Sequence, residues 1–284
     1  MKKYLSLITF SHTVFALPFA VIGYFLAASQ SHYAFDWKTF LLVLVCMVSA
    51  RSAAMAFNRF LDRDVDAKNP RTQKREIPSG KVKPVNALLF TLIAVGIFVA
   101  ATFCINRICF YLSPVALLVV LGYSFTKRFT SLSHFVLGLG LSLAPIGAYL
   151  AVAGKFELTP LLFSLAVLFW VSGFDIIYAL QDEEFDKQNK LFSIPAWLGK
   201  RNALFLSVLM HLLCAASLCA IPFIYSFGLW YWIGASVFLL LLLYQHLIVK
   251  PSDLSRINLA FFTTNGVASL VFAAFVLSDL FLHK

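Results

Sequence analysis

Three oxygen-bearing side chains, Asn58, Asp62 and Asp66, recur every four residues directly after a long apolar segment. On a helix, side chains four positions apart are offset by only about 40°, so these three share one face and Asp64 falls on the other side. One amide and two carboxylates supply the hard oxygen ligands that Mg²⁺ takes alongside phosphate oxygens. The stretch predicts a magnesium and phosphate site. Taken alone, it is also compatible with ordinary charge pairs on a solvated helix end.

A second acidic cluster repeats this spacing further along the chain. Asp182 and Asp186 are again four residues apart, and Tyr178 lies one helical turn before them on the same face. Eight of the thirteen acidic residues of the chain lie in the two clusters. Surface solvation alone would not concentrate acids in this way in an apolar chain, so we expect the clusters to act together.

Basic residues accompany both clusters. Arg59 lies within the first cluster and Arg71 follows it, while Lys127 and Arg128 directly follow the apolar run 108–126. Guanidinium and ammonium groups bind phosphate oxygens through charge-assisted hydrogen bonds. Facing carboxylates repel one another unless cations lie between them, and divalent ions bridging to a diphosphate would remove that repulsion.

Two ionisable residues lie deeper in the apolar segments. Arg51 precedes Asn58 by seven residues and Asp175 precedes Asp182 by seven, so each lies close to the face of its cluster. A charge within the bilayer costs roughly 2.5–3.5 kcal/mol on insertion scales and usually faces a bundle interior or a cavity. Either these residues serve the site, or they pair with each other or with neutral groups to hold helices together.

Composition defines the class of protein. The 284 residues are 61% hydrophobic and only 13% charged, with a mean hydropathy of +0.85, which is too apolar for a soluble domain. We expect an all-α membrane protein of about nine transmembrane helices, bundled around a central cavity that opens to the cytoplasmic side. The expected helices are 12–29, 39–58, 85–104, 108–126, 133–153, 159–181, 202–224, 228–248 and 257–281.

The distribution of Lys and Arg predicts the orientation. Short loops on the side of the N-terminus carry most of these residues, which places that end and both clusters in the cytoplasm. The net charge of +10 therefore reflects topology and one functional patch, not a nucleic-acid partner. We expect the N-terminal apolar run after Lys2 and Lys3 to be retained as the first membrane helix and not cleaved as a signal peptide. No CxxC pair indicates a cysteine metal site.

The domain organisation follows from the helix count. The clusters end the second and sixth expected helices, so four crossings separate them and both face one side. This offset suggests an internal repeat, helices one to four and five to eight with a ninth added, within a single transmembrane domain over residues 1–284. No feature indicates a particular protein partner.

Taken together, the two acidic clusters and the basic segments resemble motifs of the UbiA intramembrane prenyltransferases. The segments NRFLDRDVD (58–66) and RTQKREIPSG (71–80) resemble the first signature of that family, and YALQDEEFD (178–186) resembles the second. The segments YSFTKRFT (123–130) and FALPFA (15–20) are similar to the 4-hydroxybenzoate polyprenyltransferase branch. The resemblance covers nearly the whole chain, and the two aspartate motifs together are specific.

The resemblance implies a nine-helix bundle in a bacterial plasma membrane that uses Mg²⁺. It implies transfer of a polyprenyl group from polyprenyl diphosphate to an aromatic acceptor such as 4-hydroxybenzoate, in ubiquinone or menaquinone biosynthesis. The implied roles are metal binding and catalysis by Asn58, Asp62, Asp66, Asp182 and Asp186; diphosphate binding by Lys127, Arg128, Arg71 and Arg59; and acceptor binding by Arg51, Asp175 and Tyr178.

Two departures from the benzoate branch leave the acceptor open. Arg59 stands where many members of that branch carry Asp, and segment 190–195 lacks the Gly and Lys common before its serine. A futalosine-type menaquinone precursor is therefore an alternative acceptor, and naphthoate or haem prenylation fits less well. A membrane cation transporter would also place carboxylates between helices, but helix breaks near the midplane would then be expected. A phospholipid head-group transferase is disfavoured because its DxxDGxxAR pattern is absent.

Overall fold

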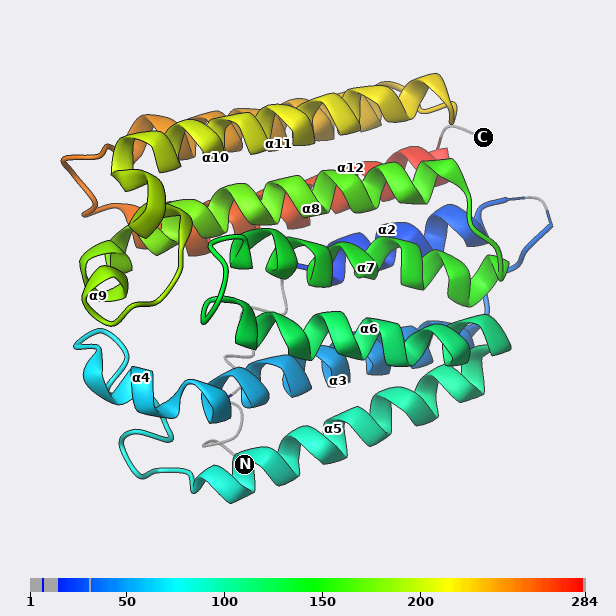
Figure 1. Cartoon of the computed structure of the whole chain (residues 1–284). Coiled ribbons are helices and arrows are strands. Elements are labelled where there is room, and N and C mark those ends of the chain that lie inside the picture. The colour runs from blue at the N-terminus through cyan, green and yellow to red at the C-terminus, as the bar shows by residue number, and fades with distance from the viewer. Residues whose placement is uncertain (1–6, 8–14, 31, 283–284) are drawn as a thin grey trace.

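The computed structural model describes residue 7, residues 15–30 and residues 32–282, and it consists of long helices arranged side by side (Figure 1). The long helices are α2 (Leu17–Ala28), α3 (Trp37–Leu61), α5 (Pro84–Ile105), α6 (Arg107–Thr126), α7 (Ser133–Ala153), α8 (Leu158–Ala179), α10 (Ile194–Ala220), α11 (Leu229–Ile248) and α12 (Asn265–Leu282). The short elements are α4 (Arg63–Lys68), α9 (Glu183–Gln188), two 3₁₀ turns, η2 (Leu180–Asp182) and η3 (Ile221–Phe223), and a π-helix, η4 (Leu259–Thr264).

The prediction of an all-helical membrane protein is confirmed. In the described part of the chain, eight helical stretches are long and apolar enough to cross a membrane. The remaining expected helix, the first one at 12–29, corresponds to α2, which is apolar but has only 12 residues. The first residues of that expected helix, like Lys2 and Lys3, lie outside the described residues.

One helix begins well before its expected position. Helix α10 starts at Ile194, whereas the apolar run indicated residue 202, because Lys200 and Arg201 interrupt the run. The start is fixed by Ser193, whose hydroxyl accepts a hydrogen bond from the Ala196 amide, followed by a proline in the first turn. Gly199, with a φ of 75°, then bends the helix.

Both aspartate motifs cross a helix break, so the expectation of one continuous face for each motif was wrong. Helix α3 ends at Leu61, and Asp62, with φ −89° and ψ 5°, separates it from α4. Helix α8 ends at Ala179 and is followed by η2 and α9. The two motifs lie at the same end of the bundle, where α4 and α9 lie near each other (Figure 1).

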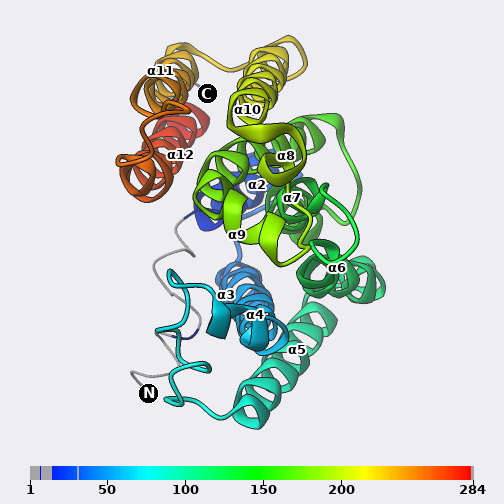
Figure 2. The same cartoon turned by 60° about the vertical axis from the view of Figure 1, so that its left-hand side comes forward.

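The centre of the bundle is an aromatic core around α2. The rings of Phe19, Trp170, Phe238 and Phe272 lie 5.3–6.3 Å apart and join α2 to α8, α11 and α12. A Cβ at Gly23 would lie 2.1 Å from the carbonyl oxygen of Pro145, so this glycine lets α2 and α7 approach closely. Viewed from the side in Figure 2, α3 and α5 lie on one side of the bundle and α10, α11 and α12 on the other, with α2, α7 and α8 between.

Candidate active site

A cavity of about 240 Å³ lies where the two motifs meet; we call it the mouth cavity. It draws side chains from the ends of α3, α6 and α8, from α4 and α9, and from the loop after α4. The sequence-predicted residues that line it are Asn58, Asp62, Asp66, Arg71, Lys127, Asp175, Tyr178, Asp182 and Asp186. The fold thus brings both acidic clusters and part of the basic set to one place.

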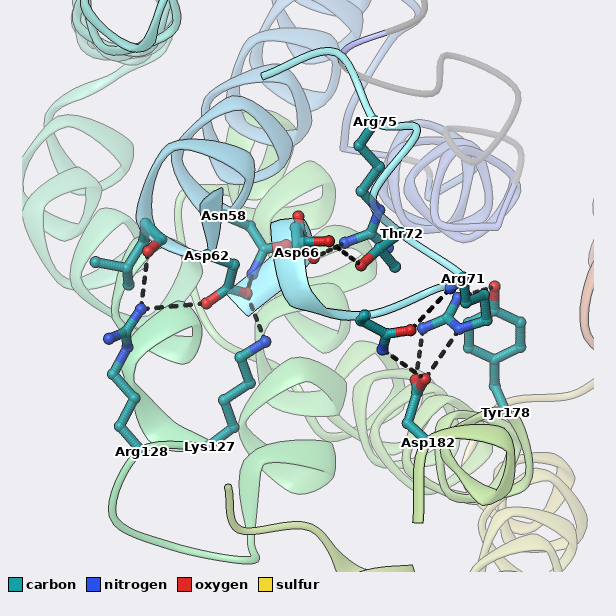
Figure 3. Close-up of polar contacts among 12 residues, drawn as sticks. Asn58, Asp62, Asp66, Arg71, Thr72, Arg75, Lys127, Arg128, Tyr178 and Asp182 are labelled. Atoms are coloured by element: carbon teal, nitrogen blue, oxygen red, sulfur yellow. Dashed lines mark hydrogen bonds and ion pairs between the residues drawn. The ribbon is translucent and has the colours of Figure 1, made fainter. Parts of the chain in front are cut away.

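The aspartates of the first motif are neutralised by basic side chains. Asp62 is 1% exposed and lies 2.7 Å from Lys127 Nζ and 3.4 Å from Arg128 Nη2 (Figure 3). The side-chain amide of Asn58 also donates a hydrogen bond to Asp62, over 3.0 Å. Asp66 pairs with Arg75 at 2.7 Å, and its Oδ2 is buried without a hydrogen-bond partner.

The aspartate at the centre of the second motif is held by the loop that follows the first. Arg71 donates to both oxygens of Asp182, from Nε over 3.0 Å and from Nη2 over 2.5 Å, and its Nη1 donates to Tyr178 Oη over 3.0 Å (Figure 3). Asn69 also donates to Asp182 over 3.1 Å. Burial alone would lower the pKa of Arg71, but the hydrogen bond and charge of Asp182 outweigh it and raise that pKa, so Arg71 stays charged.

The mouth cavity has oxygen ligands of the kind that Mg²⁺ binds, but they are not arranged around one metal position. Among residues 15–30 and 32–282, no group of three or more His, Cys, Asp or Glu side chains is close enough to hold a metal as they stand. We expected divalent ions to relieve the repulsion between the clusters, whereas Lys127, Arg71 and Arg75 do so here. The oxygen donors on one cavity and the unpartnered Asp66 Oδ2 fit Mg²⁺, provided the basic side chains exchange partners.

A second cavity of about 340 Å³, here called the inner chamber, adjoins the first. The two cavities share eight lining residues: Asn58, Arg71, Thr72, Arg75, Tyr123, Leu137, Asp175 and Tyr178. Arg51 and Arg59 both line it, and the Nε of each is buried without a hydrogen-bond partner. Five aromatic side chains form part of its wall, Phe15, Phe174, Tyr178, Phe261 and Phe262, together with aliphatic residues, Arg75 and Asp175. The chamber therefore combines two guanidinium groups, each with a buried Nε that lacks a hydrogen-bond partner, with flat apolar surfaces.

Two roles were open for the buried residues Arg51 and Asp175: serving the site, or pairing to hold helices together. The alternative that Arg51 and Asp175 pair with each other is not what the described residues show, because Asp175 instead lies 2.7 Å from Nδ1 of His134. Of the four cations expected at the diphosphate, Lys127 and Arg71 line the mouth cavity. Arg128 lies beside it and donates to the Leu61 carbonyl, whereas Arg59 is 9% exposed and lines the inner chamber.

A third cavity of about 300 Å³ is almost entirely apolar; we call it the tail cavity. It runs between α3, α5, α6 and α7, from Tyr123 at the inner chamber to Cys109 near the start of α6. At 1.5 Å per helical residue this stretch is about 20 Å long. Tyr123 lines all three cavities and thus marks their junction. The space suits an extended hydrocarbon chain.

Sequence reasoning missed several residues of this region. His134 partners Asp175, Asn69 binds Asp182, and Ser193 lines the mouth cavity together with Asp186. Each is a single polar residue with no repeating spacing to mark it. Arg75 lies in the motif segment 71–80 but was given no role, and its position four residues after Arg71 was the available signal.

Comparison with known proteins identifies the family. Residues 16–274 match the model of the UbiA prenyltransferase family, so the chain belongs to that family and is a prenyltransferase with multiple membrane spans. A protein named 4-hydroxybenzoate octaprenyltransferase from Tolumonas auensis is 32% identical over 80% of this chain and 79% of its own. One of the same name from Aeromonas salmonicida is 32% identical over 86% and 84%.

Solved structures agree with this assignment. The apo structure of a UbiA homolog from Aeropyrum pernix is 31% identical, with a TM-score of 0.85 over 94% of this chain and 98% of that one. A UbiA homolog from Archaeoglobus fulgidus, solved with GPP and Mg²⁺, shares the fold at 20% identity, with a TM-score of 0.74 over 98% and 99%. The transporter alternative is replaced by the family assignment.

Proposed function

We propose that the protein transfers a polyprenyl group from a polyprenyl diphosphate to a small aromatic acid, 4-hydroxybenzoate first among the candidates, in respiratory quinone biosynthesis. The observation that carries the proposal is the junction of three unlike cavities at Tyr123: one charged, one cationic and aromatic, one apolar. They suit, in turn, a diphosphate, an aromatic acid and a prenyl tail. The names of the relatives and the ligands of the Archaeoglobus homolog support the same reading.

The metal would be held by the oxygen-bearing residues of both motifs: Asn58, Asp62, Asp66, Asp182 and Asp186. Bound Mg²⁺ would neutralise the diphosphate and so make it a better leaving group. The carboxylates are freed for this role when their present partners turn to phosphate oxygens. Lys127 and Arg71 can do so from the cavity wall, and we assign Arg128 and Arg59 supporting roles from its edges.

The inner chamber would carry the reaction itself. Loss of diphosphate breaks the bond between the allylic carbon and oxygen and leaves a carbocation, which the face of Tyr178 can stabilise. Arg51 would hold the acceptor carboxylate in two parallel hydrogen bonds. The electron-rich ring carbon then bonds to the allylic carbon, and its proton passes to Asp175, which His134 orients.

A second acceptor class is favoured by one observation. Arg59 places a second unpaired guanidinium in the chamber that contains Arg51. An acceptor with a further anionic or hydrogen-bonding group, such as a futalosine-type menaquinone precursor, would use both. The Lys and Arg distribution supports an orientation with the N-terminus and site loops in the cytoplasm, and we place the protein in a bacterial plasma membrane. A single domain with an internal repeat remains a prediction.

The proposal is tested by supplying purified protein in lipid with Mg²⁺, radiolabelled polyprenyl diphosphates and a panel of aromatic acids. We expect a lipid-soluble labelled product with at least one hydroxylated aromatic acid, and none when the metal is chelated. The panel includes 4-hydroxybenzoate and two-ring acids, so the preferred acceptor is read directly. Hydrolysis of the diphosphate without transfer to any aromatic acid would refute the proposal.

A further inference from the structure

The wall of the inner chamber contains an irregular piece of helix. Residues Leu259–Thr264 form the π-helix η4, where hydrogen bonds skip one residue more than in an α-helix, and such turns often mark functional sites. Phe261 and Phe262 of this turn line the chamber. The Phe261 ring stacks on Tyr178 with the centroids 4.0 Å apart and the planes inclined by 28°. The π turn thus forms part of the aromatic wall of the inner chamber.

The side chain of Asn265, directly after this turn, holds it in place. Its amide nitrogen donates to the carbonyls of Ala260 over 3.1 Å and Phe261 over 3.0 Å. These carbonyls belong to the widened turn, where a backbone partner four residues on is displaced. The side-chain oxygen accepts from Trp170 Nε1 over 2.9 Å and from Gln245 Nε2 over 2.8 Å. Asn265 is 0% exposed, so all four contacts are made away from water.

The network continues into the other helices of this half of the bundle. Nε2 of His211 lies 3.3 Å from the Trp170 carbonyl, which can only accept, so His211 donates there. Its Nδ1 is then the acceptor for Nε2–H of His246, 2.8 Å away. A Cβ at Gly173 would lie 2.4 Å from the His211 ring, so the glycine makes room for it. Four helices, α8, α10, α11 and α12, are therefore joined to the one residue that fixes the π turn.

We propose that Asn265 is a positioning residue for acceptor specificity: it locks the π turn, and so sets where Phe261 and Phe262 meet the acceptor ring. Without the extra residue in the turn, these rings would shift by about 100° around the helix relative to the residues after them. This inference rests on the proposed function.

The test compares Asn265→Leu with a control on the same helix. Leucine fills a similar volume but can neither accept from Trp170 nor donate to the turn. We expect the KM for the aromatic acceptor to rise by about tenfold, the size of a lost aromatic contact, while diphosphate hydrolysis without acceptor stays within about twofold. The control is Asp279→Asn: Asp279 is 2% exposed and binds the amides of Gly228 and Tyr231 away from the chamber. It should lower thermal stability and leave the acceptor KM unchanged.

A second variant keeps the test decisive if Asn265→Leu fails to fold. Deleting the exposed Thr263 removes one residue from the π turn, so that 259–264 can close as an α-helical turn while both flanks keep their packing. The same rise in acceptor KM is expected. An unchanged acceptor KM in whichever variant folds, or equal losses of hydrolysis and transfer in it, would overturn the positioning role. A wild-type protein that prenylates no aromatic acid would instead refute the proposed function.

Discussion

The mouth cavity and the inner chamber both contain arginines, yet the two regions handle charge in opposite ways. In the mouth, Asp62, Asp66 and Asp182 each pair with a Lys or Arg at 2.5–2.7 Å. In the chamber, Arg51 and Arg59 each keep a buried Nε without a partner. Paired groups can exchange partners with an incoming metal and diphosphate at little net cost. Unpaired buried cations cost free energy until an anion arrives. The mouth therefore suits the donor, and the chamber suits an anionic acceptor.

The largest effect on prenyl transfer should come from removing an aspartate of the mouth cavity. We expect Asp62→Ala and Asp182→Ala to lower prenyl transfer by more than about a thousandfold, because each removes an oxygen ligand and the partner that orients a basic side chain. Chelation with EDTA should abolish wild-type turnover reversibly. Circular dichroism and thermal unfolding in detergent would check that the variants insert and fold.

Asp64→Ala is the matched control for that experiment. Its side chain is 82% exposed and its recorded ion pair is with Arg63 at 3.8 Å, so its loss should change transfer by less than about twofold. Full activity in Asp62→Ala or Asp182→Ala, or in metal-free buffer, would remove the metal assignment.

A smaller effect is expected at Lys127, where the KM for the diphosphate donor and the KM for the acceptor should respond differently. Lys127→Ala removes one charge-assisted contact worth ~1.5–3 kcal/mol, so the KM for prenyl diphosphate should rise by about ten- to a hundredfold. The acceptor KM should change much less. Lys187→Ala is the control, because Lys187 pairs with Glu183 at 2.6 Å and is half-exposed. If the acceptor KM rose while the donor KM stayed constant, the roles of the two cavities would be reversed.

Much of the fold could be predicted from sequence, because membrane insertion depends on hydropathy averaged over about 20 residues. The expected segments 108–126 and 133–153 match α6 and α7 closely. The breaks at Asp62 and Leu180, the bend at Gly199 and the π turn at 259–264 were not predicted. They depend on partners far along the chain: the turn is held by Asn265, which needs Trp170 and Gln245.

The candidate site, like the fold, could be predicted from the sequence only in part. Regular spacing predicted the aspartates, because the chain is helical on both sides of each break and residues four positions apart still line one cavity. Spacing could not show which charge lacks a partner, because that depends on packing. The pair formed by Asp175 and His134 joins α8 to α7, and it leaves Arg51 without the carboxylate that sequence reasoning had offered it.

The division between donor and acceptor regions is tested most directly at Arg51, by measuring diphosphate hydrolysis and prenyl transfer separately in Arg51→Lys. A lysine keeps the positive charge but cannot form the two parallel hydrogen bonds that a guanidinium makes to a carboxylate. We expect hydrolysis to persist near the wild-type rate, while transfer to a carboxylated acceptor falls by more than about tenfold. Equal losses in the two activities, or a mild effect on both, would contradict the assignment of the inner chamber to the acceptor.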